Sequence, residues 1–154
     1  MSTIDIQYAS IADDLPSEAQ LRDWCHAALL DHNQDAELTL RIVDEREIQN
    51  LNRQFRHKDK PTNVLSFPSD LPPEIKLETK LLGDVIICSN VVKREAMEQN
   101  KSLNAHWSHM VVHGTLHLQG YDHIVEAEAV EMEGIESRLM LALGFSDPYQ
   151  IEHE

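Results

Sequence analysis

Three histidines with metal-ligand spacing carry the most specific chemistry in this sequence. His113, His117 and His123 follow the pattern H-x-x-x-H-x-x-x-x-x-H. On a helix, His113 and His117 lie one turn apart on the same face, so both imidazoles can bind one ion. Gly120 can adopt a positive φ and turn the chain so that His123 reaches the same ion. Three neutral nitrogens and one open position are typical of catalytic zinc, and nickel or another first-row divalent metal accepts the same ligands.

Neighbouring residues limit what such a site can do. His109 lies eight residues before His117, and a helical rise of about 1.5 Å per residue separates the two by about 12 Å. We therefore expect His109 to pack or to support a ligand rather than to bind the ion. Asp122 has two interpretations, an acceptor for a histidine N–H or an exposed turn residue. Gly114 stands where the metalloprotease pattern H-E-x-x-H has its general-base glutamate, so the protease base is missing.

Charge is unevenly distributed along the chain. The formal net charge of −14 argues against a protein that coats nucleic acid with its whole surface. Residues 53–60 nevertheless carry four lysines and arginines and one acid, which favours a local phosphate-binding patch. Residues 126–136 contain five glutamates and no base, for which the default interpretation is a solvated helix face.

Length and composition indicate one globular domain, residues 1–154, with 42% hydrophobic and 26% charged residues. No apolar run approaches the roughly 20 residues that cross a bilayer. The N-terminus lacks the basic and apolar regions of a secretory signal, so we predict a cytoplasmic protein with no membrane partner. Cys25 and Cys88 stand far apart in no metal-binding spacing, which favours reduced, buried thiols.

Hydrophobic periodicity predicts strands mixed with helices. The predicted strands cover Ile4–Tyr8, Glu37–Val43, Asn63–Phe67 and Val85–Cys88, the last buried on both faces. Two predicted helices begin at capping boxes, one of Ser17 with Gln20 and one of Asp44 with Glu47. Three more cover Val91–Asn100, Leu103–Leu118 and Val125–Leu143. We expect an α+β fold in which helices cover a small mixed sheet. The zinc site would lie on a long helix and the turn after it, as in metzincins.

Three motifs in one order resemble those of the YbeY family of bacterial metal-dependent endoribonucleases, and the resemblance covers essentially the whole chain. They are H-G-x-L-H-L-x-G-Y-D-H at residues 113–123, F-R-x-x-D-x-P-T-N-V-L-S-F-P at 55–68 and G-D-V-I-I at 83–87. The resemblance implies that the three histidines hold zinc and that Arg56 takes part in the activity. It also implies a role in maturation of the 3′ end of 16S ribosomal RNA and in ribosome quality control. The implied partners are single-stranded RNA and the small ribosomal subunit.

The residues are consistent with phosphodiester chemistry on their own terms. A guanidinium binds phosphate through two N–H groups and keeps its charge, so Arg56 suits a phosphate under attack. Lys58 and Lys60 have two interpretations, weaker phosphate-positioning charges or an ordinary solvated loop. We expect Asp84 to order a backbone turn or a neighbouring basic side chain. Two nucleophiles are compatible with these residues, water and the 2′-hydroxyl of the RNA.

Two other functions compete with this hypothesis. The histidine spacing equals the long metzincin pattern, but a zinc protease would lack general-base help that is typically worth about 10²–10⁴-fold. A non-catalytic ribosome-assembly factor with a structural metal fits the acidic charge. It fits the three-ligand site less well, because structural zinc normally has four protein ligands. Oligomeric state, cleavage position and the metal used in the cell are open at this stage.

Overall fold

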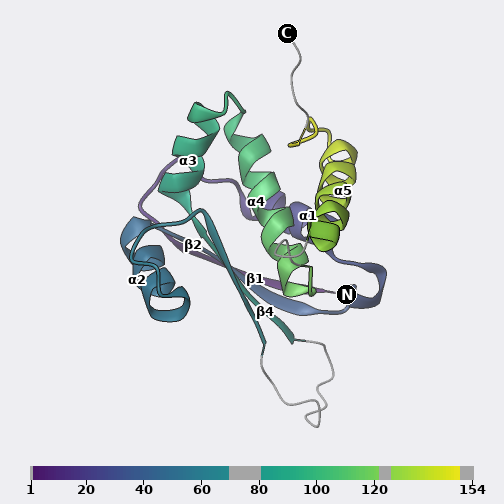
Figure 1. Ribbon diagram of the computed structural model, residues 1–154, viewed down its shortest axis with the longest axis horizontal. Helices are drawn as coiled ribbons and strands as arrows, with labels where there is room; N and C mark the ends of the chain where they lie inside the picture. The colour runs from purple at the N-terminus through teal and green to yellow at the C-terminus, as the bar shows by residue number, and fades with distance from the viewer. Residues whose placement is uncertain (1, 70–80, 122–125, 150–154) are drawn as a thin grey trace.

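A four-stranded mixed sheet forms the centre of the computed structural model, which describes residues 2–69, 81–121 and 126–149 (Figure 1). The strands are β1 (Thr3–Ala9), β2 (Glu37–Val43), β3 (Val64–Pro68) and β4 (Leu81–Cys88). Their order is β1-β2-β4-β3. The β1–β2 and β2–β4 pairs are parallel, whereas β3 runs antiparallel to β4 and forms an edge of the sheet. The strand predicted to be central is therefore central.

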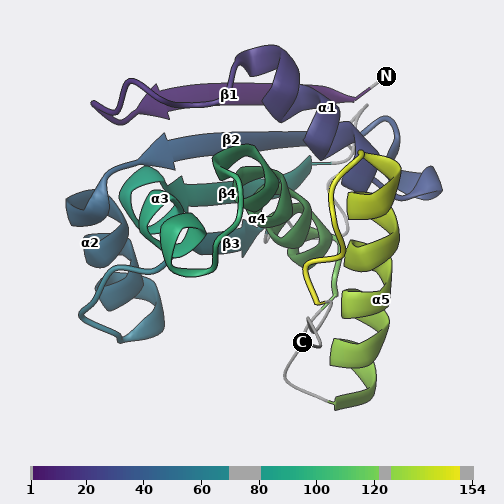
Figure 2. The same ribbon diagram turned by 90° about the horizontal axis from the view of Figure 1, so that it is seen from above.

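Helices cover both faces of this sheet unequally. The described helices are α1 (Glu18–Ala28), α2 (Glu45–Arg56), α3 (Ser89–Glu98), α4 (Leu103–Leu118), α5 (Glu126–Ala142) and the short 3₁₀ helix Asp31–Asn33. Helices α1 and α4 lie over one face, α2 lies against the other, and α5 packs beside α4 (Figures 1 and 2). The α+β prediction of helices around a small mixed sheet is confirmed. None of the described helices has the length and apolar character needed to span a bilayer.

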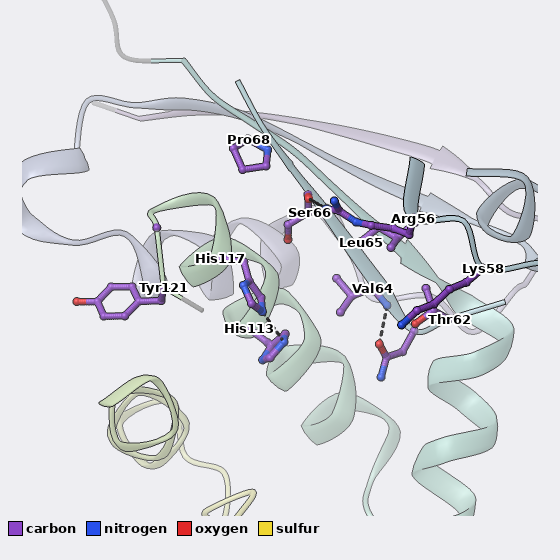
Figure 3. Close-up of a pocket in the computed structure, with 12 residues that line it drawn as sticks. Arg56, Lys58, Thr62, Val64, Leu65, Ser66, Pro68, His113, His117 and Tyr121 are labelled. Carbon is purple, nitrogen blue, oxygen red and sulfur yellow. Dashed lines mark hydrogen bonds between the residues drawn. The ribbon is translucent and has the colours of Figure 1, made fainter. Parts of the chain in front are cut away.

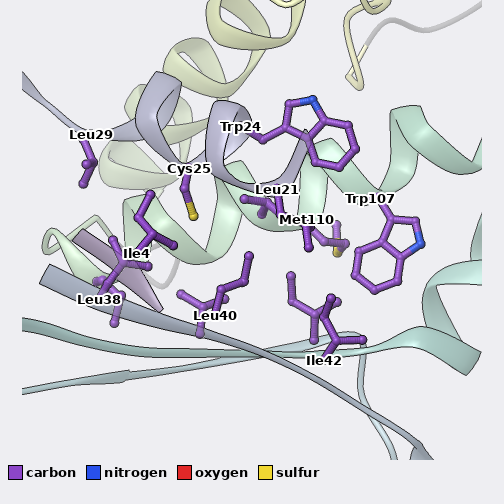
Figure 4. Packing of buried hydrophobic residues seen from close by; sticks show 14 of the residues in the cluster. Ile4, Leu21, Trp24, Cys25, Leu29, Leu38, Leu40, Ile42, Trp107 and Met110 are labelled. Atoms are coloured by element: carbon purple, nitrogen blue, oxygen red, sulfur yellow. The ribbon is translucent and has the colours of Figure 1, made fainter. Parts of the chain in front are cut away.

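The largest cluster of buried apolar side chains fills the space between the sheet and helices α1 and α4 (Figure 4). Leu21 and Trp24 of α1, Leu40 of β2, and Trp107 and Met110 of α4 belong to it. Each buried aliphatic or aromatic side chain of this kind contributes about 1.5–3 kcal/mol of hydrophobic free energy. This layer therefore holds α4, the helix with the candidate ligands, firmly against the sheet.

Helix α4 has the predicted bounds, Leu103–Leu118. The Ser102 side chain accepts a hydrogen bond from the Ala105 N–H and caps its N-terminus. After the helix, Gly120 adopts a φ of 99°, as the sequence predicts for a residue that turns the chain. From His106 to Leu118 every residue of α4 is buried except His113 and His117, which are partly exposed. The helix thus presents only its two candidate ligands toward solvent along this stretch.

Two predicted helix starts differ in detail from the structure. The Ser17–Gln20 capping box forms as expected, but Asp44 makes no capping bond to α2. Its carboxylate instead accepts bonds from the hydroxyls of Ser10 and Ser89, so a tertiary contact replaces the local one. Helix α3 begins at Ser89, without a side-chain cap, two residues earlier than predicted.

Candidate metal centre and phosphate site

The two helical histidines converge as their spacing predicts. The Nε2 atoms of His113 and His117 lie 3.1 Å apart on the exposed side of α4 (Figure 3). Two nitrogen ligands at about 2.0–2.1 Å from one tetrahedral ion would lie roughly 3.3 Å from each other. The pair therefore has the separation of two ligands to a single ion.

A buried carboxylate contacts His113 at Nδ1, the ring nitrogen that does not face His117. The Oε1 atom of Glu136 on α5 lies 2.5 Å from His113 Nδ1, and its other oxygen accepts a hydrogen bond from the Tyr149 hydroxyl. Burial alone would raise the pKa of Glu136, but bonds from His109, His113 and Tyr149 lower it to about 2. An ionised Glu136 accepts the Nδ1 proton of His113, which assigns the lone pair of that ring to Nε2. In this arrangement Nε2 is the atom of His113 that could bind a metal.

His109 completes the buried side of this centre. Its Nε2 lies 3.6 Å from Glu136 Oε1, and its Nδ1 is buried with no hydrogen-bond partner among the described residues. His109, His113 and Glu136 each offer one ligand atom within 4.8 Å of the others, so this buried group could also hold a metal. His113 belongs to both arrangements, one facing solvent and one facing the interior.

Two residues singled out from the sequence lie outside the described part of the chain. They are Asp122 and the third predicted ligand, His123. The ligand role of His123 accordingly stays a prediction, as do both interpretations of Asp122. Glu136, by contrast, was missed by the sequence analysis, which assigned residues 126–136 to a solvated face. A signal for its burial exists, since Met132 and Met140 lie four residues before and after it and all three are buried.

Arg56 is the last residue of α2, and two contacts hold its guanidinium. Nη2 donates to the carbonyl oxygen of Ser66 on β3 at 2.9 Å. The guanidinium carbon lies 5.5 Å from the centre of the Phe67 ring, a cation–π distance. Helix α2 ends here because His57 adopts a left-handed conformation with φ 60° and ψ 30°. The side chain is exposed, so its remaining N–H groups can reach a ligand.

The outer edge of β3 carries backbone groups that do not pair with β4. In the antiparallel register these belong to Val64, Ser66 and Pro68. The Val64 N–H donates to Asn63 Oδ1 at 2.7 Å, and the Ser66 carbonyl accepts from Arg56. Pro68 has no N–H. Groups of this chain therefore engage the Val64 N–H and the Ser66 carbonyl of this edge.

A cavity of about 840 Å³ joins the histidines to the arginine. It is lined by Arg56, Lys58, Thr62, Asn63, Val64, Leu65, Ser66, Pro68, His113, His117, Gly120 and Tyr121. Figure 3 shows the imidazoles on one side and Arg56 with Lys58 on the other, with β3 between them. The predicted site residues Arg56, Lys58, His113 and His117 thus share one cavity. Lys60 is exposed and is not among the described lining residues, and Asp84 is exposed on β4.

Gly114 brings the histidine pair close to the sheet. A Cβ atom at this position would lie 2.5 Å from Val85 Cγ1 and 3.1 Å from Val64 Cγ2, far inside normal contact. The Ser66 hydroxyl donates to the Gly114 carbonyl oxygen at 3.0 Å across the same contact. A glutamate at position 114 would therefore collide with β3 and β4. The position that carries the protease base in H-E-x-x-H is a packing contact here.

Comparisons with known proteins identify a family and a similar fold. The profile of the family described as Endoribonuclease YbeY matches residues 5–144. The solution structure of TM1509 from Thermotoga maritima is similar, with 24% sequence identity and a TM-score of 0.57. That alignment covers 95% of this chain and 99% of TM1509, and at this identity it supports the fold alone. The family match spans most of the chain, and with the paired histidines and the arginine in one cavity it shows that the protein belongs to the YbeY family of endoribonucleases, which act on RNA.

Proposed function

We propose that this protein is a zinc-dependent endoribonuclease specific for single-stranded RNA. It would act in the cytoplasm on the small ribosomal subunit, in maturation of the 16S RNA 3′ end and in ribosome quality control. The observation that carries the proposal is the shared cavity of His113, His117 and Arg56. It combines a pair of nitrogen ligands with a phosphate-binding cation, whereas a peptide bond would need no such cation.

The chemistry of the donors fits a divalent ion on the cavity side. His113 and His117 would hold it through Nε2, and we assign the third position to His123. Such an ion supplies Lewis acidity toward a phosphoryl oxygen and toward water. Zinc suits three imidazoles best, and nickel or another first-row metal is compatible with them. The role of Glu136 would be to keep the proton of His113 on Nδ1 and the ring in place.

Arg56 would bind the non-bridging oxygens of the phosphate under attack. Its anchor on the Ser66 carbonyl leaves other N–H groups free to donate, and its charge persists at any physiological pH. Charge that grows on the phosphoryl oxygens during attack strengthens these bonds, so Arg56 would stabilise the transition state more than the ground state. Lys58 would add a weaker positioning charge from the cavity wall. We assign Lys60 only a long-range electrostatic contribution, because it lies outside that wall.

One observation favours a second candidate, a non-catalytic ribosome-assembly factor with a structural metal. The buried group of His109, His113 and Glu136 could hold an ion away from any substrate. The 2.5 Å separation of His113 Nδ1 and Glu136 Oε1 argues against it, because a shared proton fits that gap and an ion does not. We therefore place the metal on the Nε2 side.

Cleavage of a labelled single-stranded RNA by metal-loaded protein tests the proposal. We expect His117→Ala to lose metal and activity together, and Arg56→Ala to keep the metal but lose activity. Matched controls are the exposed His26→Ala and Arg46→Ala, which lie outside the cavity and should cleave like the wild type. Equal cleavage by all five proteins would point to a contaminating nuclease and refute the catalytic assignment. Loss of metal in His109→Ala but not in His117→Ala would favour the structural-metal candidate.

The product ends distinguish the two nucleophiles. Direct attack by water leaves a linear phosphate, whereas attack by the 2′-hydroxyl leaves a 2′,3′-cyclic phosphate. Mass spectrometry of the first products decides between them. Either result is compatible with the roles of His113, His117 and Arg56.

A further inference from the structure

An exposed aromatic side chain immediately precedes Arg56, the proposed phosphate ligand, in the chain. Phe55 is 52% exposed, although a phenylalanine of this size is usually buried. Its ring meets that of Phe67 edge to face, with centroids 5.3 Å apart and planes at 65°. This contact fixes the orientation of Phe55 and leaves much of its ring open to solvent. The fold thus presents an aromatic surface to solvent at the end of α2.

Phe55 and Arg56 are coupled through the same partner. Phe67 contacts the Phe55 ring and also lies under the Arg56 guanidinium. Phe67 itself packs against the buried cluster beneath α2, so it is a rigid base for both. The aromatic surface and the phosphate-binding group are therefore held in a constant relative position.

The segment that contains Phe55 carries positive charge on an otherwise acidic protein. Arg53, Arg56, Lys58 and Lys60 are all exposed. None of the four forms an ion pair within the described ranges. Asp59, the acid among them, accepts a bond from Gln49. An exposed aromatic ring in a segment with several exposed basic side chains is typical of surfaces that bind single-stranded nucleic acid, with the ring against a base and the cations along the phosphates.

We propose that Phe55 is a stacking site for an unpaired nucleobase next to the phosphate held by Arg56. This inference rests on the proposed function and adds to it a substrate subsite and a source of selectivity. A base can lie flat on Phe55 only if it has left a neighbouring base in a helix, so the subsite favours single-stranded RNA over duplex. The site tolerates different bases, because every base has a π-face.

Binding of a short, cleavage-resistant RNA to the metal-loaded protein tests this inference. The RNA carries one 2-aminopurine between uridines, so stacking on Phe55 should quench its fluorescence. We expect Phe55→Ala to raise Kd about 5- to 150-fold and to abolish quenching, the range found for the loss of one base–aromatic stack. The preference for single-stranded over double-stranded RNA should fall with it.

Substitutions at the same position separate stacking from packing. Phe55→Trp and Phe55→Tyr should keep both affinity and quenching, whereas Phe55→Leu should behave like Phe55→Ala, although leucine keeps an apolar contact with Phe67. Met97→Ala, at an apolar residue on α3 that is 73% exposed, is the matched control and should leave Kd unchanged. Wild-type affinity in Phe55→Leu would refute stacking. Wild-type affinity and quenching in Phe55→Ala would also refute it. The exposed ring would then be a candidate contact for a protein partner instead.

The outcomes separate this inference from the proposed cleavage. If no protein cleaves RNA but Phe55→Ala loses quenching and affinity, the stacking site stands and the nuclease proposal fails. If the wild type cleaves RNA and Phe55→Ala binds and cleaves equally well, the nuclease proposal stands and the stacking site fails. A wild-type protein that binds no RNA would refute both.

Discussion

Replacement of Gly114 by alanine tests the packing that positions the histidine pair. The added Cβ would lie 2.5 Å from Val85 Cγ1, about 0.9 Å short of the 3.4 Å at which ordinary contact begins. Val85 is fully buried and its side chain is short and branched, so it cannot swing away. Helix α4 must therefore move away from the sheet, or β4 must deform.

The expected free-energy change is a difference between two terms. Overpacking of this kind costs about 1–3 kcal/mol, and the better helix propensity of alanine returns up to about 1 kcal/mol. Gly134→Ala on α5 isolates the second term, because a Cβ at that position meets no atom within 4 Å from outside its own stretch of helix backbone. Gly134→Ala should stabilise the protein by up to about 1 kcal/mol. Gly114→Ala should then lie about 1–3 kcal/mol below that control.

Urea denaturation of the wild type and four variants checks the result: Gly114→Ala, Gly134→Ala, Val85→Ala and the double variant with alanine at 114 and 85. In the double variant the clashing methyl group is gone, so alanine at 114 should cost less, with a coupling of about 0.5–3 kcal/mol. RNA cleavage by Gly114→Ala should fall by up to about 100-fold, since a displacement near 1 Å separates the histidines from Arg56. Equal free energies of unfolding for Gly114→Ala and Gly134→Ala would refute the close-contact argument. Strictly additive effects of Gly114→Ala and Val85→Ala would also refute it.

Three further predictions concern other parts of the centre and the core. Glu136→Gln should keep the fold but weaken metal binding about 10- to 100-fold in a chelator competition, because a neutral amide oxygen accepts the His113 Nδ1 proton more weakly than a carboxylate does; unchanged affinity would contradict this role. Arg56→Lys should keep the charge but lose most of the cleavage rate, since lysine cannot bond Ser66 and phosphate in one planar array; wild-type kcat would argue against it. Burial raises the pKa of Cys25 to about 12, so the folded protein should not react there with iodoacetamide at pH 8. The thiol of the unfolded chain ionises at lower pH, so the stability that Cys25 contributes should fall as pH rises from about 8.5 toward 12; rapid labelling at pH 8 or flat stability over that interval would contradict the prediction.

Local sequence patterns were sufficient for most of the fold and for the convergence of His113 with His117. The bounds of α4 and the turn at Gly120 were predicted because helix periodicity, the spacing of His113 and His117, and the conformational freedom of glycine are all local properties. The position of β4 in the sheet followed from its continuous apolar run. Such features depend on neighbours within a few residues, which a single sequence contains.

Tertiary partners account for what the sequence did not reveal. Glu136 looked like one more glutamate on an acidic helix, because its burial depends on His113 and Tyr149 from distant parts of the chain. Asp44 with Glu47 looked like a capping box, but Glu47 pairs with Arg41 on β2 instead. Both errors have one cause: a carboxylate binds the strongest donors within reach, and those donors came from other elements.

The bond from Arg56 to the edge of β3 also bears on how the protein behaves in concentrated solution. An unpaired strand edge is a template on which a second molecule can extend the sheet. Arg56 blocks the Ser66 carbonyl with a charged group, the Asn63 side chain engages the Val64 N–H, and Pro68 offers no donor. Removal of Arg56 would therefore remove the proposed phosphate ligand and also the charged group that protects this edge from self-association. A low activity of Arg56→Ala accordingly reports on catalysis only in samples that light scattering shows to be as free of aggregates as the wild type.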